Sequence, residues 1–188
     1  MQMRNLMATA IFCCLTALRA AGPTREVLGV KMPETIAVDD KVLRLDGIGV
    51  RKEKLLFNVY VVAFYLEQPT RDAQLAIVSD REKRIQLSML RDITRQQFIQ
   101  ALETAILLNS REGMPALRSR LDLLESALPA PKKGDQLSLT YVPGVGTLLR
   151  SSVRELTIPG KDFADALLSV WLGPKPISGT LKRQLLAG

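Results

Sequence analysis

The sequence predicts an α+β fold, and three observations support this prediction. Strand patterns occupy residues 36–66 and return at residues 84–90. The hydrophobic period then changes from that of a strand to that of a helix at Thr94. Short strand patterns follow over residues 136–159, and helical patterns finish the chain. Strands and helices grouped in this way are typical of α+β domains rather than of alternating βαβ units.

Residues 1–21 are predicted to be a secretory signal. They begin with a short basic stretch, continue with an apolar run that ends at Leu18, and offer small residues for cleavage at Ala20 or Ala21. The apolar run is too short to span a bilayer comfortably, although Leu18 and Arg19 make an imperfect cleavage site and leave an uncleaved anchor as the alternative. Charges interrupt every later apolar run. We therefore expect residues 22–188 to form one periplasmic or secreted domain without a membrane span.

The composition excludes several kinds of chemistry. Cys13 and Cys14 both lie in the predicted leader, and the chain contains no histidine. Disulfides, thiolate catalysis, Cys-ligated metals and Ser-His-Asp hydrolysis are therefore excluded for the mature chain. We expect neither a metal nor another cofactor.

The scattered positions of the basic residues favour a solvated surface over a nucleic-acid site. The net charge is +7, and it becomes +5 once Arg4 and Arg19 are removed, because the leader has no acidic residue. The remaining basic residues are scattered along the chain. Few aromatic residues accompany them, so the sequence lacks the stacking platform that a nucleic-acid binder would use.

The first two long strands are predicted to form a β-hairpin. Residues 42–51 alternate, and strict alternation places five of them on one face: Leu43, Leu45, Gly47, Gly49 and Arg51. The polar sequence KEK at residues 52–54 predicts the turn. Residues 55–67 are apolar on both faces, which is typical of a central strand that is covered on both sides.

The remaining elements have clear boundary signals. Thr94 and Gln97 form a capping-box pattern that begins a helix. A second helix is predicted from about Pro115 to Leu128, a loop follows to residue 135, and Gly173 and Ser178 separate two C-terminal helices. The three intervening strands are predicted at residues 136–142, 147–152 and 154–159.

The sequence LDGIGVR at residues 45–51 predicts a binding site. Glycine within a strand marks a bulge or a close approach to the backbone. An apolar floor at Leu43 and Leu45, a notch at Gly47 and Gly49, and a cation at Arg51 would suit a long amphiphilic carboxylate. Arginine can hold a carboxylate through two parallel hydrogen bonds. The alternative is a structural bulge with Arg51 as a surface residue.

Other polar positions are open to two interpretations. Asn58 and Tyr60 interrupt an apolar strand and are predicted to share one face. They either contact a ligand or are satisfied internally. The sequence PGVG at residues 143–146 favours a hairpin turn over a phosphate loop, because no lysine and helix start follow it.

The sequence GIGVR, followed by YVVAFYLE at residues 60–67, resembles the chalcone isomerase-like family. The similarity continues through RDITRQQF at residues 91–98 and WLGPKPISGTLKRQLL at residues 171–186. The resemblance implies a large antiparallel sheet wrapped by helices with a ligand cleft between them. It also implies that Arg51 contacts the ligand, which is a chalcone in the plant isomerases and a fatty acid in non-catalytic members.

The resemblance is weaker at the other isomerase positions. Tyr60 and Val170 stand where the plant enzymes are expected to have threonines, and only Asn109 lies in the region of the helix Tyr and Asn of the isomerase cleft. These departures weaken the stabilisation of an oxyanion more than they weaken binding. We therefore predict binding of a fatty acid or similar amphiphile. An intramolecular lyase and a non-catalytic, partner-binding scaffold remain the alternatives.

Overall fold

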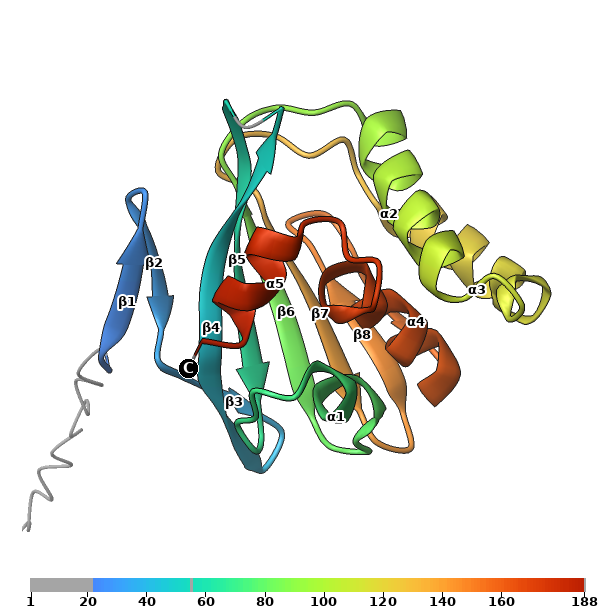
Figure 1. Cartoon of the computed structure of the whole chain (residues 1–188), viewed down its shortest axis with the longest axis horizontal. Coiled ribbons are helices and arrows are strands. Elements are labelled where there is room, and N and C mark those ends of the chain that lie inside the picture. The colour runs from blue at the N-terminus through green and yellow to red at the C-terminus, as the bar shows by residue number, and fades with distance from the viewer. Residues whose placement is uncertain (1–21, 55, 188) are drawn as a thin grey trace, which may run out of the picture.

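The computed structural model describes residues 22–54 and 56–187, and a seven-stranded antiparallel sheet organises them. The strand order is β3-β4-β5-β6-β7-β8-β9, so strands that are consecutive in the chain are neighbours in the sheet (Figure 1). The predicted leader lies outside the described residues. The strands of the sheet are β3 (Thr35–Val38), β4 (Lys41–Glu53), β5 (Phe57–Leu66), β6 (Lys83–Met89), β7 (Gln136–Val142), β8 (Gly146–Arg150) and β9 (Glu155–Ile158).

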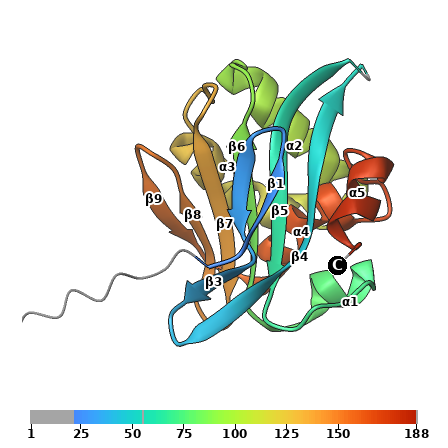
Figure 2. The ribbon, with the colours of Figure 1, turned by 90° about the vertical axis from the view of Figure 1, so that its left-hand side faces the viewer.

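A separate hairpin of β1 (Thr24–Val27) and β2 (Val30–Pro33) lies on the face of the sheet opposite the helices (Figure 2). Its turn places Leu28 and Gly29 at φ values of 51° and 79°. Positive φ at both central residues is the property of a type I′ turn, whose twist suits a tight hairpin. This hairpin was not predicted from the sequence.

The helices are set by local signals. α2 (Arg95–Asn109) begins with the predicted capping box, and α3 (Met114–Ala127) begins with a proline in its first turn. α4 (Lys161–Leu172) ends at Gly173, and the Ser178 side chain caps α5 (Gly179–Leu185). The short α1 (Ala73–Val78), capped by Asp72, was not predicted. None of the helices that the structure describes is both long and apolar enough to cross a membrane.

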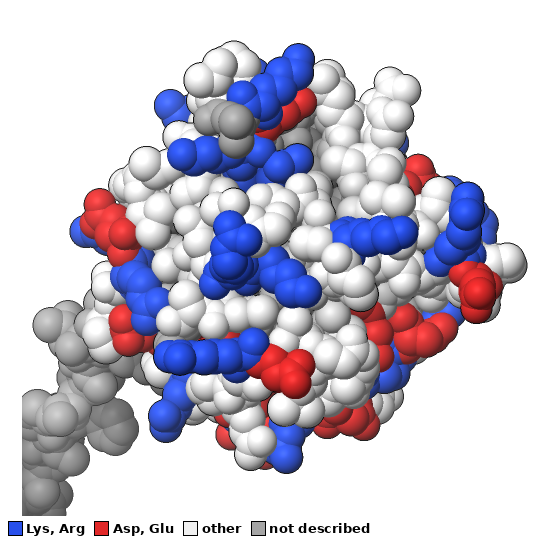
Figure 3. Space-filling view, viewed as in Figure 1, with Lys and Arg blue, Asp and Glu red and all other residues white. Residues whose placement is uncertain are grey.

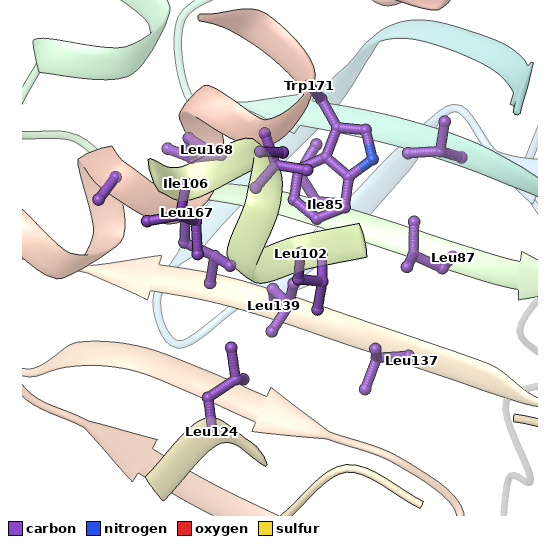
Figure 4. Packing of buried hydrophobic residues seen from close by; sticks show 14 of the residues in the cluster. Ile85, Leu87, Leu102, Ile106, Leu124, Leu137, Leu139, Leu167, Leu168 and Trp171 are labelled. Carbon is purple, nitrogen blue, oxygen red and sulfur yellow. The ribbon is translucent and has the colours of Figure 1, made fainter. Parts of the chain in front are cut away.

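The main hydrophobic core lies between the sheet and the helices. Figure 4 shows Trp171 of α4 beside side chains from the sheet strands and from α2. A second, smaller core lies on the other face and is completed by the β1–β2 hairpin. β5 contributes Val62 and Phe64 to the first core and Val61 and Ala63 to the second. The prediction of a central strand covered on both sides is therefore confirmed.

Two irregularities change the faces of the long β4–β5 hairpin. Leu45 pairs with Tyr65 whereas Gly47 pairs with Phe64, so Asp46 is an extra residue in β4. Near the hairpin turn, the register shifts again and Val59 is the extra residue in β5. Because side chains alternate along a strand, each extra residue moves the side chains beyond it to the opposite face. The strict alternation assumed from the sequence is therefore wrong at both places.

Candidate functional site

The glycine notch of β4 is occupied by α5. A Cβ atom on Gly47 would lie 2.4 Å from the backbone carbonyl carbon and oxygen of Leu185. A Cβ atom on Gly49 would lie 2.6 Å from the side chains of Gln184 and Leu181. The two glycines therefore allow a helix to pack closely against the strand. The close approach predicted from LDGIGVR exists, but the neighbour is the protein's own C-terminal helix.

Beside this helix lies a cavity of about 520 Å³. It is bounded by α2, by the β4–β5 end of the sheet and by the connection from α4 to α5, segments that Figure 1 shows around the upper part of the molecule. The volume lies within the range of about 300–1,000 Å³ that is usual for small-molecule sites. Much of its lining is apolar: Val59, Ile93, Phe98, Ala101, Leu102, Ala105, Leu108, Pro176 and Ile177.

Arg51 and Tyr60, two of the residues predicted to bind a ligand, both line this cavity. They are directly opposite each other in the β4–β5 register. Arg51 is half-buried, and its guanidinium donates a hydrogen bond to the carbonyl of Lys52 at 2.6 Å. No carboxylate among the described residues forms an ion pair with Arg51. Its charge is therefore available to an anionic ligand.

The Tyr60 hydroxyl is held by Trp171. The indole Nε1 of Trp171 donates to the Tyr60 oxygen at 3.2 Å, deep in the core. Because an indole N–H can only donate, the Tyr60 proton is left to donate elsewhere. Burial raises the pKa of Tyr60 to about 12, partly offset by the Trp171 hydrogen bond and the Arg51 charge. The hydroxyl is therefore protonated at neutral pH and suited to donate to a ligand oxygen.

Two further charged residues line the cavity on its exposed side. Lys175 belongs to the α4–α5 connection, and Glu53 ends β4. Neither side chain forms an ion pair within the described parts of the chain. With Arg51, the cavity has two cations and one carboxylate, so its charged end is net positive. This arrangement favours an anion over a cation.

Asn109, a predicted ligand contact, instead fastens the wall of the cavity. Its amide nitrogen donates to the carbonyls of Ala105 at 2.8 Å and Lys175 at 2.9 Å. Its amide oxygen accepts from the backbone N–H of Lys175 at 2.9 Å. The amide thereby joins the end of α2 to the α4–α5 connection. Asn109 is not among the residues that line the cavity.

The structure separates three other predicted site residues from the cavity. Leu43 and Leu45 belong to the second core, on the far face of the sheet, because the extra residue Asp46 reverses the alternation. Asn58 is likewise turned away from Tyr60 by the extra residue in β5, and it lines a shallow depression on the hairpin side. The predictions that Leu43 and Leu45 share a face with Arg51, and that Asn58 shares one with Tyr60, are wrong.

The contribution of α2 to the cavity was not predicted from the sequence. Gln97, Gln100, Ala101, Thr104 and Leu108 line the cavity from one side of this helix. Their spacing of three, four and seven residues was visible in the sequence. A search for an apolar face selects Phe98, Leu102 and Ile106, of which Phe98 and Leu102 also line the cavity, but it passes over the polar residues Gln97, Gln100 and Thr104 beside them.

The cavity combines an apolar wall with a cation and a protonated hydroxyl. The described residues contain no group of three or more His, Cys, Asp or Glu side chains that could hold a metal ion.

Comparisons with known proteins agree with this fold. The family model described as chalcone isomerase-like matches residues 24–187. The structure is similar to the crystal structure of an Arabidopsis thaliana fatty-acid binding protein, with a TM-score of 0.68 and 16% sequence identity over 87% of this chain and 96% of the plant chain. No curated protein matches the sequence. The predicted fold class and the predicted family resemblance are confirmed.

Proposed function

Because the chain belongs to the chalcone isomerase-like family, we propose that it binds a fatty acid or a related amphiphilic carboxylate in the cavity beside Arg51. The observation that carries this proposal is the pairing of Arg51 and Tyr60 at an otherwise largely apolar cavity. Among the described residues, no carboxylate forms an ion pair with Arg51, and no acceptor takes the Tyr60 hydroxyl proton. A carboxylate would satisfy both. The similar plant structure is described as a fatty-acid binding protein, which agrees with this choice.

The head group would be held by charge-assisted hydrogen bonds. The guanidinium of Arg51 offers parallel donors to a carboxylate, and Tyr60 adds one more. Trp171 fixes the orientation of the Tyr60 ring oxygen, so little side-chain freedom remains to be lost on binding.

The tail would pack against the apolar residues of α2 and of the α4–α5 connection. Each buried CH₂ contributes about 0.8 kcal/mol, so the hydrocarbon chain would supply most of the affinity. Glycines 47 and 49 serve this site indirectly, because they allow α5 to dock beside it. We further propose that the protein acts outside the cytoplasm, since residues 1–21 have the layout of a secretory signal.

Titration with oleate tests the proposal. Trp171 is the only tryptophan and contacts Tyr60, so its fluorescence reports on the head-group end of the cavity. Arg51→Ala should weaken oleate binding roughly 10- to 100-fold, because it removes charged hydrogen bonds. Tyr60→Phe should weaken binding by less, since one hydrogen bond to a phenol is lost.

Arg44→Ala is the matched control. Arg44 lies on the same strand, is exposed and does not line the cavity. Thermal melting should show that all three variants are folded. Unchanged oleate affinity in a folded Arg51→Ala variant would contradict the proposed anchor.

The same variants distinguish the two alternatives. Chalcone cyclisation should not exceed the spontaneous rate, because the position expected to be threonine is Val170, whose side chain is wholly buried. Stereoselective flavanone formation that is lost in Arg51→Ala would replace binding with intramolecular lyase activity. A protein that binds neither oleate nor chalcone would favour a partner-binding scaffold.

A further inference from the structure

The β4–β5 turn and its surroundings expose large apolar side chains. Leu56 is 79% exposed and Phe57 is 49% exposed, at the point where the turn enters β5. Leu28, in the β1–β2 turn, is 57% exposed. These three residues line one shallow depression together with Asn58, Leu90, Arg91 and Lys133. We call the three apolar residues, with Arg91 and Lys133, the hairpin patch.

Cations surround the apolar part of the hairpin patch. Lys52 and Lys54 flank it on the β4 side and are exposed. Arg91 lies over the ring of Phe57, with 5.2 Å between the guanidinium carbon and the ring centroid. Within the described part of the chain, Lys52, Lys54, Arg91 and Lys133 form no ion pair. In Figure 3, Lys and Arg side chains predominate over acidic ones at this end, at the top of the view.

The hairpin patch and the cavity lie at the same end of the β4–β5 strand pair. The β4–β5 end carries Asn58 in the depression of the patch and Val59 in the lining of the cavity, because of the extra residue in β5. The two sites are therefore on opposite sides of the same strand pair. Arg51 and Glu53, at the same end of β4, line the cavity.

We propose that the hairpin patch docks the protein onto the surface of an anionic lipid bilayer. Leu56 and Phe57 would enter the interfacial region, and the unpaired cations would face lipid phosphates and other anionic head groups. Each cation near an anionic bilayer surface strengthens partitioning about fivefold, so four of them act together with the inserted apolar side chains. Docking at this end would bring the cavity beside the membrane. The inference does not depend on which ligand the cavity binds.

The shape and charge of the hairpin patch favour a bilayer over a folded protein partner. The apolar residues sit on turns rather than on a flat face, so they would bury little area against a rigid surface, whereas stable protein interfaces bury about 1,200–2,000 Å² in total. A fluid interface can surround a projecting turn. The excess of free cations matches a surface of uniform negative charge rather than one of mixed charge.

A tryptophan at the patch provides a local test. Leu56→Trp places a reporter on the patch, while native Trp171 is wholly buried and shielded. In vesicles of phosphatidylcholine and phosphatidylglycerol with brominated acyl chains, its emission should fall at least about twofold. Val145→Trp is the matched control, because Val145 is also exposed but lies in the β7–β8 turn at the opposite end of the sheet. Its emission should not change.

Charge reversal provides the second test. Lys52→Glu combined with Lys133→Glu should reduce partitioning into anionic vesicles by about 20-fold or more, given the contribution of each cation. Arg44→Glu combined with Arg81→Glu changes the net charge equally, at the opposite end of the sheet, and should have little effect. Added salt should weaken binding of the native chain.

Several outcomes would overturn the proposal. Equal quenching at positions 56 and 145 would mean that another segment, such as residues 1–21, binds the lipid. Equal binding to vesicles of phosphatidylcholine alone would exclude the role of the cations. Absence of vesicle binding, with oleate still bound, would overturn docking and leave the proposed function intact.

Discussion

Gly47→Ala tests whether the strand glycines exist for α5. The added Cβ would lie 2.4 Å from the backbone of Leu185 and 2.5 Å from the carbonyl oxygen of Gln184. Backbone atoms cannot rotate away as a side chain can, so the helix must shift or detach. Overpacking of this kind costs about 1–3 kcal/mol. Complete undocking of α5 would expose Leu181 and Leu185, at about 1.5–3 kcal/mol for each side chain.

We therefore expect Gly47→Ala to lower the free energy of unfolding by about 2–4 kcal/mol in urea titrations. Gly49→Ala should lower the free energy of unfolding by less, about 1 kcal/mol, because its new Cβ would contact the side chains of Gln184 and Leu181, which can move. Gly179→Ala is the control within α5: its Cβ would have only one neighbour, at 4.0 Å. Its stability should be unchanged or raised by up to about 1 kcal/mol.

Limited trypsin digestion gives a second measurement of the same effect. α5 contains Lys182 and Arg183, which become cleavable when the helix detaches from the sheet. Gly47→Ala should be cut there faster than the native chain, with the rest of the domain intact. If Gly47→Ala is as stable and as resistant as Gly179→Ala, then close packing of α5 is not the reason for the glycine.

Three further predictions concern other parts of the molecule. Lys83→Met should lower the free energy of unfolding by about 2–4 kcal/mol, because three carbonyls at the end of α1 would lose the buried Lys83 nitrogen as a donor. Burial lowers the pKa of Lys83 to about 8, whereas its ordinary value is 10.5. Between these two pH values the unfolded chain binds more protons than the folded chain, so the stability of the native protein rises with pH. The difference in free energy of unfolding between native and Lys83→Met should therefore grow by about 2 kcal/mol from pH 8 to 10. Asn109→Ala should lower the free energy of unfolding by about 1–3 kcal/mol and weaken oleate binding several-fold, because the amide joins α2 to the α4–α5 connection. An unchanged oleate affinity would mean that the connection holds its shape without the amide. Intact-mass measurement on protein from its own host should show cleavage near Ala20 or Ala21, and a chain that retains Met1 would contradict export through a cleaved signal.

The family and most element boundaries could be read from the sequence because they depend on local signals. The capping box at Thr94 and Gln97 begins α2, and Gly173 ends α4, as predicted. The apolar pattern of β5 correctly indicated a strand covered on both sides. Short elements were missed where the signal was brief, as in the six-residue α1. Arg51 and Tyr60, predicted as ligand contacts from the position after the glycines and from the polarity in an apolar strand, both line the cavity, and their contact with a ligand stays a prediction.

Tertiary contacts determine which side chains share a face of the sheet and which segment packs against the strand glycines. A single extra residue at Asp46 places Leu43 and Leu45 behind the sheet, and another at Val59 separates Asn58 from Tyr60. Such irregularities depend on the pairing of two strands, so one strand's pattern does not reveal them. The sequence is limited in the same way at Gly47. A glycine within a strand indicates that another segment packs closely against the backbone, but it does not identify that segment. Here the neighbour is α5, more than a hundred residues further along the chain, and only the packed structure brings the two together.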